Sequence, residues 1–300
     1  MYNTYGITPK SLNYKTYQNL IFDIKNNIHK IPSNIDLIVG IPRSGMIPAY
    51  MLGLMLSKQV CSLYEFLNED FKTNTTVRVK FSGEIRNILI VDDSILSGNA
   101  YTKAKDLIKQ SKLDGLYNIT YCAIYYKDDN YKKFIDIALE KVNSPRIFQW
   151  NYLNHCFLQD AAFDIDGVLC KDPLPQENDD GEKYKNFLLN AKPLFIPQYK
   201  IPYIITSRLE KYRKETEEWL KNNNVKYDHL IMLNGYTAEE RKRLNLHAKF
   251  KAEQYKKLKD IQLFIESDKR QAEEISKLTG KLCFCASTDE LFGKNKKTLN

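Results

Sequence analysis

Residues 87–100 read Asn-Ile-Leu-Ile-Val-Asp-Asp-Ser-Ile-Leu-Ser-Gly-Asn-Ala, and this stretch decides how the first half of the chain is interpreted. Its apolar, β-branched start predicts a buried strand. Asp92 and Asp93 follow at the carboxyl end of that strand, and then come a turn over 94–99 and a helix over 101–111. Strand, polar loop and helix in this order predict an α/β fold, in which ligands bind outside the carboxyl ends of the strands.

The acidic pair and the loop after it suit a sugar phosphate, because carboxylates accept hydrogen bonds from vicinal hydroxyls and helix N-termini cradle phosphate. The stretch resembles the PRPP-binding motif of type I phosphoribosyltransferases. The resemblance implies that Asp92 and Asp93 bind the ribose hydroxyls and that residues 94–99 wrap the 5′-phosphate. The contacts with this phosphate would come from Ser94, Ser97, Gly98 and Asn99. The family often has a hydroxyl residue where this chain has Ala100. The alternative is an ordinary Asp-Asp turn after a parallel strand.

A second strand, loop and helix precede the first about fifty residues earlier, with the loop Gly40-Ile-Pro-Arg-Ser-Gly45 between a strand over 35–39 and a helix over 46–57. Arg43 suits bidentate pairing with a diphosphate. Ser44 and Gly45 allow close approach of the backbone. The loop resembles the pyrophosphate loop of the same family. Its alternative is a tight turn that carries Arg43 as a surface cation.

The family also has a mobile hairpin between these motifs, which brings a cation to the pyrophosphate. Lys72, Arg78 and Lys80 are the candidates, and the alternation over 77–81 predicts a strand there. An exposed strand with solvated cations is the alternative. Trp150 is open to two interpretations: a stacking platform for a base, or packing that closes the domain.

In the second half, residues 161–169 read Ala-Ala-Phe-Asp-Ile-Asp-Gly-Val-Leu, which predicts a strand that places Asp164 and Asp166 on one face. Paired carboxylates suit a divalent metal, or a nucleophile with a general acid. The stretch resembles motif I of haloacid dehalogenase-like phosphatases. That resemblance implies that Asp164 attacks phosphorus, that Asp166 protonates the leaving oxygen, and that Mg²⁺ bridges Asp164 and the phosphate. The alternative is a calcium-type or turn Asp pair.

The later motifs of that family follow in order. A strand over 201–205 ends at Thr206, which is the expected phosphate-binding hydroxyl, with Ser207 as the alternative. Lys251, at the head of a helix, is the expected charge-neutralising lysine, and Lys249 stays open. Residues 263–268 resemble motif IV, with Ser267 as a departure. The expected Mg²⁺ ligands are Asp164, Asp166, Glu266 and Asp268.

The chain length of 300 residues predicts two domains. With the motifs, these are a phosphoribosyltransferase-like domain over 1–155 and a haloacid dehalogenase-like domain over 156–300. Both are expected to be α/β with mainly parallel sheets. No apolar run approaches the roughly 20 residues of a membrane span. The first residues lack a signal-peptide pattern, and six scattered cysteines suit the reducing cytoplasm. A net charge of +8, without a basic and aromatic stripe, favours phosphorylated small molecules over nucleic acid.

Together the motifs predict a cytoplasmic bifunctional enzyme of nucleotide metabolism. It would transfer phosphoribose from PRPP to a nitrogenous base and hydrolyse a phosphate monoester, its own nucleotide product included. Two alternatives stay open: a PRPP or nucleotide sensor that regulates the phosphatase, and a phosphatase for nucleic-acid ends. A homodimer is expected from relatives of the first domain.

Overall fold

The computed structural model describes residues 12–72 and 84–293. The expected strand over 77–81, with Arg78 and Lys80, and the side chain of Lys72 lie outside the described residues. The chain divides into two compact units. The N-terminal unit is Lys15–Trp150, and the C-terminal unit is the chain from Asn151 onward together with residues 12–14.

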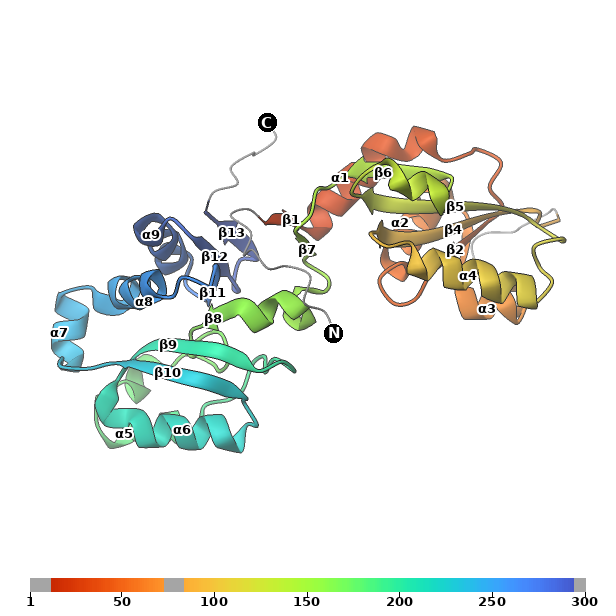
Figure 1. Ribbon diagram of the computed structural model, residues 1–300. Coiled ribbons are helices and arrows are strands. Elements are labelled where there is room, and N and C mark those ends of the chain that lie inside the picture. The colour runs from red at the N-terminus through yellow and green to blue at the C-terminus, as the bar shows by residue number, and fades with distance from the viewer. Residues whose placement is uncertain (1–11, 73–83, 294–300) are drawn as a thin grey trace. The chain divides into compact units, whose positions relative to one another are not determined.

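In the described part of the N-terminal unit, five strands form one sheet in the order β3-β2-β4-β5-β6, and every neighbouring pair is parallel (Figure 1). The strands are β2 (Leu37–Gly40), β3 (Gln59–Ser62), β4 (Asn87–Ile95), β5 (Asn118–Tyr126) and β6 (Ile137–Lys141). The helices are α1 (Tyr17–Asn27), α2 (Met46–Leu56), α3 (Leu63–Leu67) and α4 (Asn99–Gln110). Two short strands, β1 (Asn13–Lys15) and β7 (Arg146–Phe148), are not part of this sheet.

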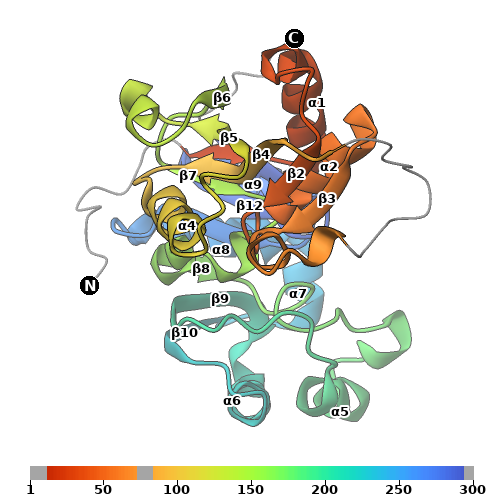
Figure 2. The same cartoon turned by 90° about the vertical axis from the view of Figure 1, so that its right-hand side faces the viewer.

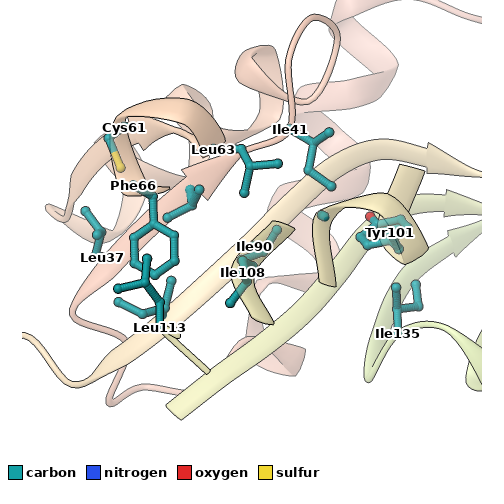
Figure 3. Packing of buried hydrophobic residues seen from close by; sticks show 14 of the residues in the cluster. Leu37, Ile41, Cys61, Leu63, Phe66, Ile90, Tyr101, Ile108, Leu113 and Ile135 are labelled. Carbon is teal, nitrogen blue, oxygen red and sulfur yellow. The ribbon is translucent and has the colours of Figure 1, made fainter. Parts of the chain in front are cut away.

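The central strand β4 is apolar on both faces because helices cover both sides of the sheet. Ile88 and Ile90 point into a cluster that includes side chains of α3 and α4, such as Phe66 (Figure 3). Leu89 and Val91 point the other way, into a cluster with side chains of α1 and α2. The alternation follows from the period of two in a strand. Both layers therefore hold β4 rigidly at the point where its acidic pair begins.

Two boundaries differ from the sequence expectation. β4 continues to Ile95, because Asp92 and Ser94 keep their pairing with β5, so Ser94 belongs to the strand and not to the turn. α4 begins at Asn99, directly after Gly98, whose φ is +81°. A Cβ atom on Gly98 would lie 2.5 Å from the ring of Phe134. The turn is thus shorter than expected, and only glycine fits its last position.

The C-terminal unit has a sheet whose described strands run in the order β10-β9-β8-β11-β12-β13, and all but the last pair are parallel. The strands are β8 (Ala161–Phe163), β9 (Ile201–Leu209), β10 (Tyr227–Leu233), β11 (Leu263–Glu266), β12 (Leu282–Cys285) and β13 (Glu290–Phe292). The helices are α5 (Glu182–Asn190), α6 (Arg213–Asn222), α7 (Ala238–Arg243), α8 (Leu246–Lys257) and α9 (Lys269–Thr279).

Helices cover both faces of this sheet as well: α8 and α9 lie on one side of β9 and β10, and α5 and α6 lie on the other (Figure 2). Ala252 of α8 and Ile275 of α9 belong to the apolar cluster on the first side. On α6, Trp219 is fully buried and donates its indole N–H to the carbonyl of Ala191 at 2.7 Å.

β8 is shorter than expected, since the strand that was predicted to carry Asp164 and Asp166 on one face ends at Phe163. Asp164 and Asp166 therefore lie in the loop that follows the strand. Lys251 lies in the middle of α8 and not at its head. The expected fold class is confirmed: each unit is α/β, with a mainly parallel sheet between helices. In the ranges that the structure describes, no helix is long and apolar enough to cross a membrane.

Candidate functional site

The two loops predicted to share a site in the N-terminal unit are neighbours. The amide of Ile41 donates to the carbonyl of Val91 at 2.9 Å, which ties the loop after β2 to β4. A Cβ atom on Gly45 would lie 2.7 Å from the carbonyl oxygen of Val91, so a side chain there would push the loop away. The peptide between Pro42 and Arg43 is cis. Gly45 thus fixes the distance between the loop and the acidic pair.

Asp93 is the centre of this site. Its carboxylate accepts a hydrogen bond from the hydroxyl of Ser44 at 3.0 Å and another from the indole N–H of Trp150 at 2.6 Å. The ring of Trp150 stacks on Phe148 with centroids 4.8 Å apart and planes 2° apart. The packing alternative for Trp150 agrees with this stack, but the hydrogen bond to Asp93 was not expected. Both donors to Asp93 are neutral.

Asp92 is buried beside it, and one of its oxygens accepts the backbone N–H of Asp93 at 2.8 Å. Burial, and then the neighbouring charge of Asp93, raise the pKa of Asp92 well above its usual value. Two buried carboxylates held by neutral donors would be stabilised by a ligand that brings hydroxyl donors or a cation.

The remaining residues of the expected PRPP site surround this pair. Arg43 and Ser97 are exposed on the loops that follow β2 and β4, and Asn99 is exposed at the start of α4, at the same edge of the sheet. Gly98 is buried at the N-terminus of α4. The structure therefore brings Ser44, Gly45, Asp92 and Asp93 together. It places Ser94 in β4, Arg43 and Ser97 on the adjoining loops, and Gly98 and Asn99 at the start of α4.

In the C-terminal unit, a cavity of about 720 Å³ opens at the carboxyl edge of the sheet. Six of the predicted site residues line it: Asp164, Asp166, Ser207, Lys251, Glu266 and Asp268. They come from the loop after β8, the end of β9, the middle of α8 and the end of β11.

Lys251 is buried at the centre of this group. Its ammonium lies 2.7 Å from a carboxylate oxygen of Asp164 and also contacts Glu266. Burial alone would lower the pKa of Lys251, but the two carboxylates raise it well above its usual value. Burial raises the pKa of Glu266 to about 7, even against the charge of Lys251. Lys249 is exposed, so the structure places Lys251, and not Lys249, among the acidic residues.

Asp166 has a partner that sequence reasoning missed. The guanidinium of Arg208 binds both of its carboxylate oxygens, at 2.6 and 3.1 Å. Burial opposes the charge of Asp166, but Arg208 holds the pKa of that carboxyl below its usual value. Asp166 was expected as a general acid and as a metal ligand. In this structure its carboxylate is directed to Arg208.

The course of β9 determines whether the hydroxyl of Thr206 or that of Ser207 faces the cavity. Ser207 lines it, and its hydroxyl lies 3.0 Å from Nδ1 of His247. Thr206 is buried, and its hydroxyl accepts the backbone N–H of Arg208 at 3.3 Å. Burial, followed by the charge of Arg241, lowers the pKa of His247 to about 4, so its ring is neutral at pH 7. The geometry favours Ser207, the alternative, over Thr206.

The ligand atoms available in the cavity are of the type that Mg²⁺ prefers, because Asp164, Glu266 and Asp268 present carboxylate oxygens to it. Several of these oxygens already have partners: Lys251 contacts Asp164 and Glu266, and Asp268 caps α9 by accepting the amide of Gln271. In the described ranges, no three acidic, histidine or cysteine side chains converge as a metal site by themselves. An ion here would therefore also need backbone or water ligands.

Further residues that line the cavity were missed, among them Asp172, Arg241 and His247. His247 had a usable signal, because it precedes Lys251 by four residues and so shares its face of the helix. Arg208 directly follows the predicted hydroxyls, and residues 206 and 208 lie on one face of a strand. Asp172 lies in a loop-like segment, and Arg241 lies in a segment rich in lysine and arginine. No local sequence pattern distinguishes either residue.

Neither a protein-family model nor a curated protein matches the chain. Over about its N-terminal half, the chain is similar to solved structures of phosphoribosyltransferases. The Helicobacter pylori xanthine-guanine-hypoxanthine phosphoribosyltransferase is 14% identical with a TM-score of 0.35, over 47% of this chain and 93% of that one. The Pyrococcus horikoshii purine phosphoribosyltransferase is 19% identical with a TM-score of 0.34, over 46% and 93%. The Aeropyrum pernix orotate phosphoribosyltransferase is 14% identical with a TM-score of 0.30, over 42% and 70%.

Proposed function

We propose that the chain is a bifunctional enzyme that acts on phosphorylated substrates. The N-terminal unit would transfer phosphoribose from PRPP to a nitrogenous base, and the C-terminal unit would hydrolyse a phosphate monoester. The observation that carries the proposal is the cavity in which Lys251 lies between Asp164 and Glu266. A buried ammonium between carboxylates is a ready counter-charge for a phosphoryl group.

The hydrolytic step follows from the residues at the cavity. A carboxylate oxygen of Asp164 forms a bond to phosphorus while the bond to the ester oxygen breaks, and water then hydrolyses the aspartyl-phosphate. The leaving oxygen needs a proton, which the family resemblance assigns to Asp166. Arg208 holds both oxygens of Asp166, so Asp166 can donate only after one of them leaves the guanidinium. Ser207 would hold a phosphoryl oxygen.

Mg²⁺ stays part of the proposal, held by Asp164 and Asp268 with backbone or water ligands. When bound, it would stabilise the negative charge of the phosphoryl oxygens. The chain's own contribution is separate: Lys251 orients Asp164 by a direct contact, and Glu266 keeps Lys251 in place.

The transferase part rests on the acidic pair. Asp92 and Asp93 would bind the ribose hydroxyls, Ser44 and Gly45 would bring the loop after β2 to the pyrophosphate, and Arg43 would pair with it. A nitrogen of the base would attack the anomeric carbon while the bond from that carbon to pyrophosphate breaks. Fixed donors would stabilise the departing charge.

Two assays test the two parts separately. Calorimetry with PRPP and Mg²⁺ should show binding that is lost in Asp92→Asn/Asp93→Asn. Release of inorganic phosphate from nucleoside monophosphates should be lost in Asp164→Asn, while Asp160→Asn, a change outside the cavity, should retain it. Absence of phosphate release by the wild type would contradict the hydrolase. If the protein makes a nucleotide and never dephosphorylates it, the coupling of the two steps is wrong.

A sensing role for the N-terminal unit is the second candidate, and one contact favours it. Asp93 already has two donors from the chain, Ser44 and Trp150, so ligand binding would have to rearrange them. PRPP that changes the rate of phosphate release without any consumption of a base would indicate a sensor. Consumption of PRPP only in the presence of a base would indicate a transferase.

A further inference from the structure

One end of the C-terminal cavity contains an arginine without an acidic partner among the described residues. Arg241 lies on α7, lines the cavity and is 5% exposed. One terminal nitrogen donates to the backbone carbonyl of Ser207 at 2.8 Å. Its Nε is buried and has no hydrogen-bond partner in the part of the chain that the structure describes. A buried donor left in this way is costly, so the described part of the chain satisfies this guanidinium only in part.

The polar side chains around Arg241 are neutral. His247 is neutral at pH 7, since burial and the charge of Arg241 lower its pKa to about 4. Burial, then Asp166, raise the pKa of the Tyr184 phenol, while Arg208 and Arg241 act in the opposite direction. The hydroxyl of Ser207 carries no charge. This end of the cavity therefore carries the positive charge of Arg241, which no carboxylate in the described ranges binds, whereas Arg208 and Lys251 each have an acidic partner.

The positive end lies beside the phosphoryl end. His247 and Lys251 share one face of α8, one turn apart, and the hydroxyl of Ser207 reaches His247. At the phosphoryl end, Lys251 is already balanced by Asp164 and Glu266. The cavity, at about 720 Å³, lies in the range of sites that hold a whole small molecule. A substrate could therefore present one group to Asp164 and another to Arg241.

We propose that Arg241 binds a second anionic group of the substrate, so that the cavity selects phosphate monoesters that also carry a phosphate or a carboxylate. The inference rests on the proposed hydrolase function and specifies its substrate class. Arg241 supplies charge-assisted hydrogen bonds, and its guanidinium matches the planar geometry of a carboxylate or two oxygens of a phosphate.

The test uses two matched pairs of substrates. Ethyl phosphate and 2-phosphoglycolate differ by one carboxylate, and adenosine 5′-phosphate and adenosine 3′,5′-bisphosphate differ by one phosphate. Phosphate release is measured for the wild type, Arg241→Gln and Arg241→Lys. Arg243→Gln is the control, because Arg243 is an exposed arginine two residues further along the same helix and does not line the cavity.

Arg241→Gln should reduce kcat/KM for the second-anion member of at least one pair by about 10- to 100-fold more than for its partner, mainly through KM. Arg241→Lys should restore part of the loss, and Arg243→Gln should behave as the wild type. The pair that responds tells whether a carboxylate or a phosphate is bound. Equal losses within both pairs would overturn the proposal, since Arg241 would then serve the reacting phosphate or the fold.

Direct binding separates this inference from the hydrolase itself. In Asp164→Asn, calorimetry with 2-phosphoglycolate and the 3′,5′-bisphosphate should show binding that weakens when Arg241→Gln is added. If the wild type hydrolyses no ester but this binding depends on Arg241, the hydrolase function is wrong and the anion site stands. Absent binding, or binding that ignores Arg241, contradicts the anion site.

Discussion

The two acidic pairs of the molecule are stabilised in opposite ways. In the N-terminal unit, Asp93 is held by the neutral donors Ser44 and Trp150, and Asp92 is buried beside it. In the C-terminal unit, Asp164 and Asp166 are each bound by a buried cation. The first pair is held by neutral donors, which suits hydroxyls and cations as ligands. The second is close to neutral, so its cations can be shared with an incoming phosphate.

Removal of Lys251 should break the second arrangement most strongly. Lys251→Met leaves Asp164 and Glu266 buried without a counter-charge and should cost about 3–5 kcal/mol of unfolding free energy. The loss should shrink as pH falls toward about 7, because without Lys251 the pKa of Glu266 rises above its wild-type value of about 7 and the buried carboxyl takes up a proton. Urea unfolding measures it. The exposed Lys249→Met is the control and should change stability by less than about 0.5 kcal/mol. Equal stability of both variants would contradict the central role of Lys251.

Removal of Arg208 should have a smaller effect, because the side chain of Asp166 is 20% exposed. Arg208→Gln should destabilise the protein by about 2–3 kcal/mol. It should also raise the pKa of Asp166, which moves the alkaline limb of the phosphatase rate profile, where a general acid loses its proton, to higher pH. A double-mutant cycle with Asp166→Asn isolates the pair. A coupling energy below about 0.5 kcal/mol would show that the bidentate contact contributes little.

The two pairs should respond to pH with opposite signs. The pKa of Asp92 is raised on folding, so its contribution to stability is lost as pH rises above the usual aspartate value. The pKa of Asp166 is lowered on folding, so its contribution is present above that value and is lost as pH falls. Each effect is at most about 1.4 kcal/mol per pH unit. Urea unfolding between pH 3.5 and 7, chosen to bracket aspartate titration at about 3.9, should show that Asp92→Asn gains stability relative to the wild type as pH rises, whereas Asp166→Asn loses it. If the stabilities of the two variants changed with pH in parallel, the predicted difference between Asp92 and Asp166 would be wrong.

Loss of the indole N–H should have the smallest effect. Trp150→Phe keeps the stack on Phe148 but removes a donor to Asp93, and the half-buried position of Trp150 limits the cost to about 1 kcal/mol. The same variant in an Asp93→Asn background should lose less. If the two substitutions are additive in urea unfolding, the contact between Trp150 and Asp93 carries no energy of its own.

Much of the framework follows from sequence periodicity. The apolar runs before Asp92 and Asp164 place both acidic pairs at strand ends, since a short run that is apolar on both faces and is followed by turn residues is typical of a covered strand. Strand ends are less predictable. β4 continues through its acidic pair because β5 offers partners there, and β8 stops at Phe163. Pairing partners are distant in sequence, so no local pattern shows them.

The cations of the site were harder to predict than its acids. Lys251 lies on the buried face of α8 with Ala248, Ala252 and Tyr255, whereas Lys249 is exposed. This difference can be recognised only once the helix is known. The sequence contains 45 lysines and arginines, so Arg208 and Arg241 are difficult to single out from it. Their significance comes from burial, which depends on the packing of β9 and α7. The choice between Thr206 and Ser207 depends on which face of β9 meets the cavity. The sequence of a strand does not by itself show which of its two faces that is.

The hydrogen bond of Trp150 has a spectroscopic consequence. The chain has two tryptophans, one in each unit: Trp150 donates to a carboxylate and Trp219 donates to a backbone carbonyl. Trp219 is fully buried and Trp150 is half-buried, so solvent quenchers should distinguish them. Indole emission responds to a nearby negative charge. In a Trp219→Phe background, the remaining fluorescence therefore becomes an optical readout of whatever occupies the acidic pair of the N-terminal unit.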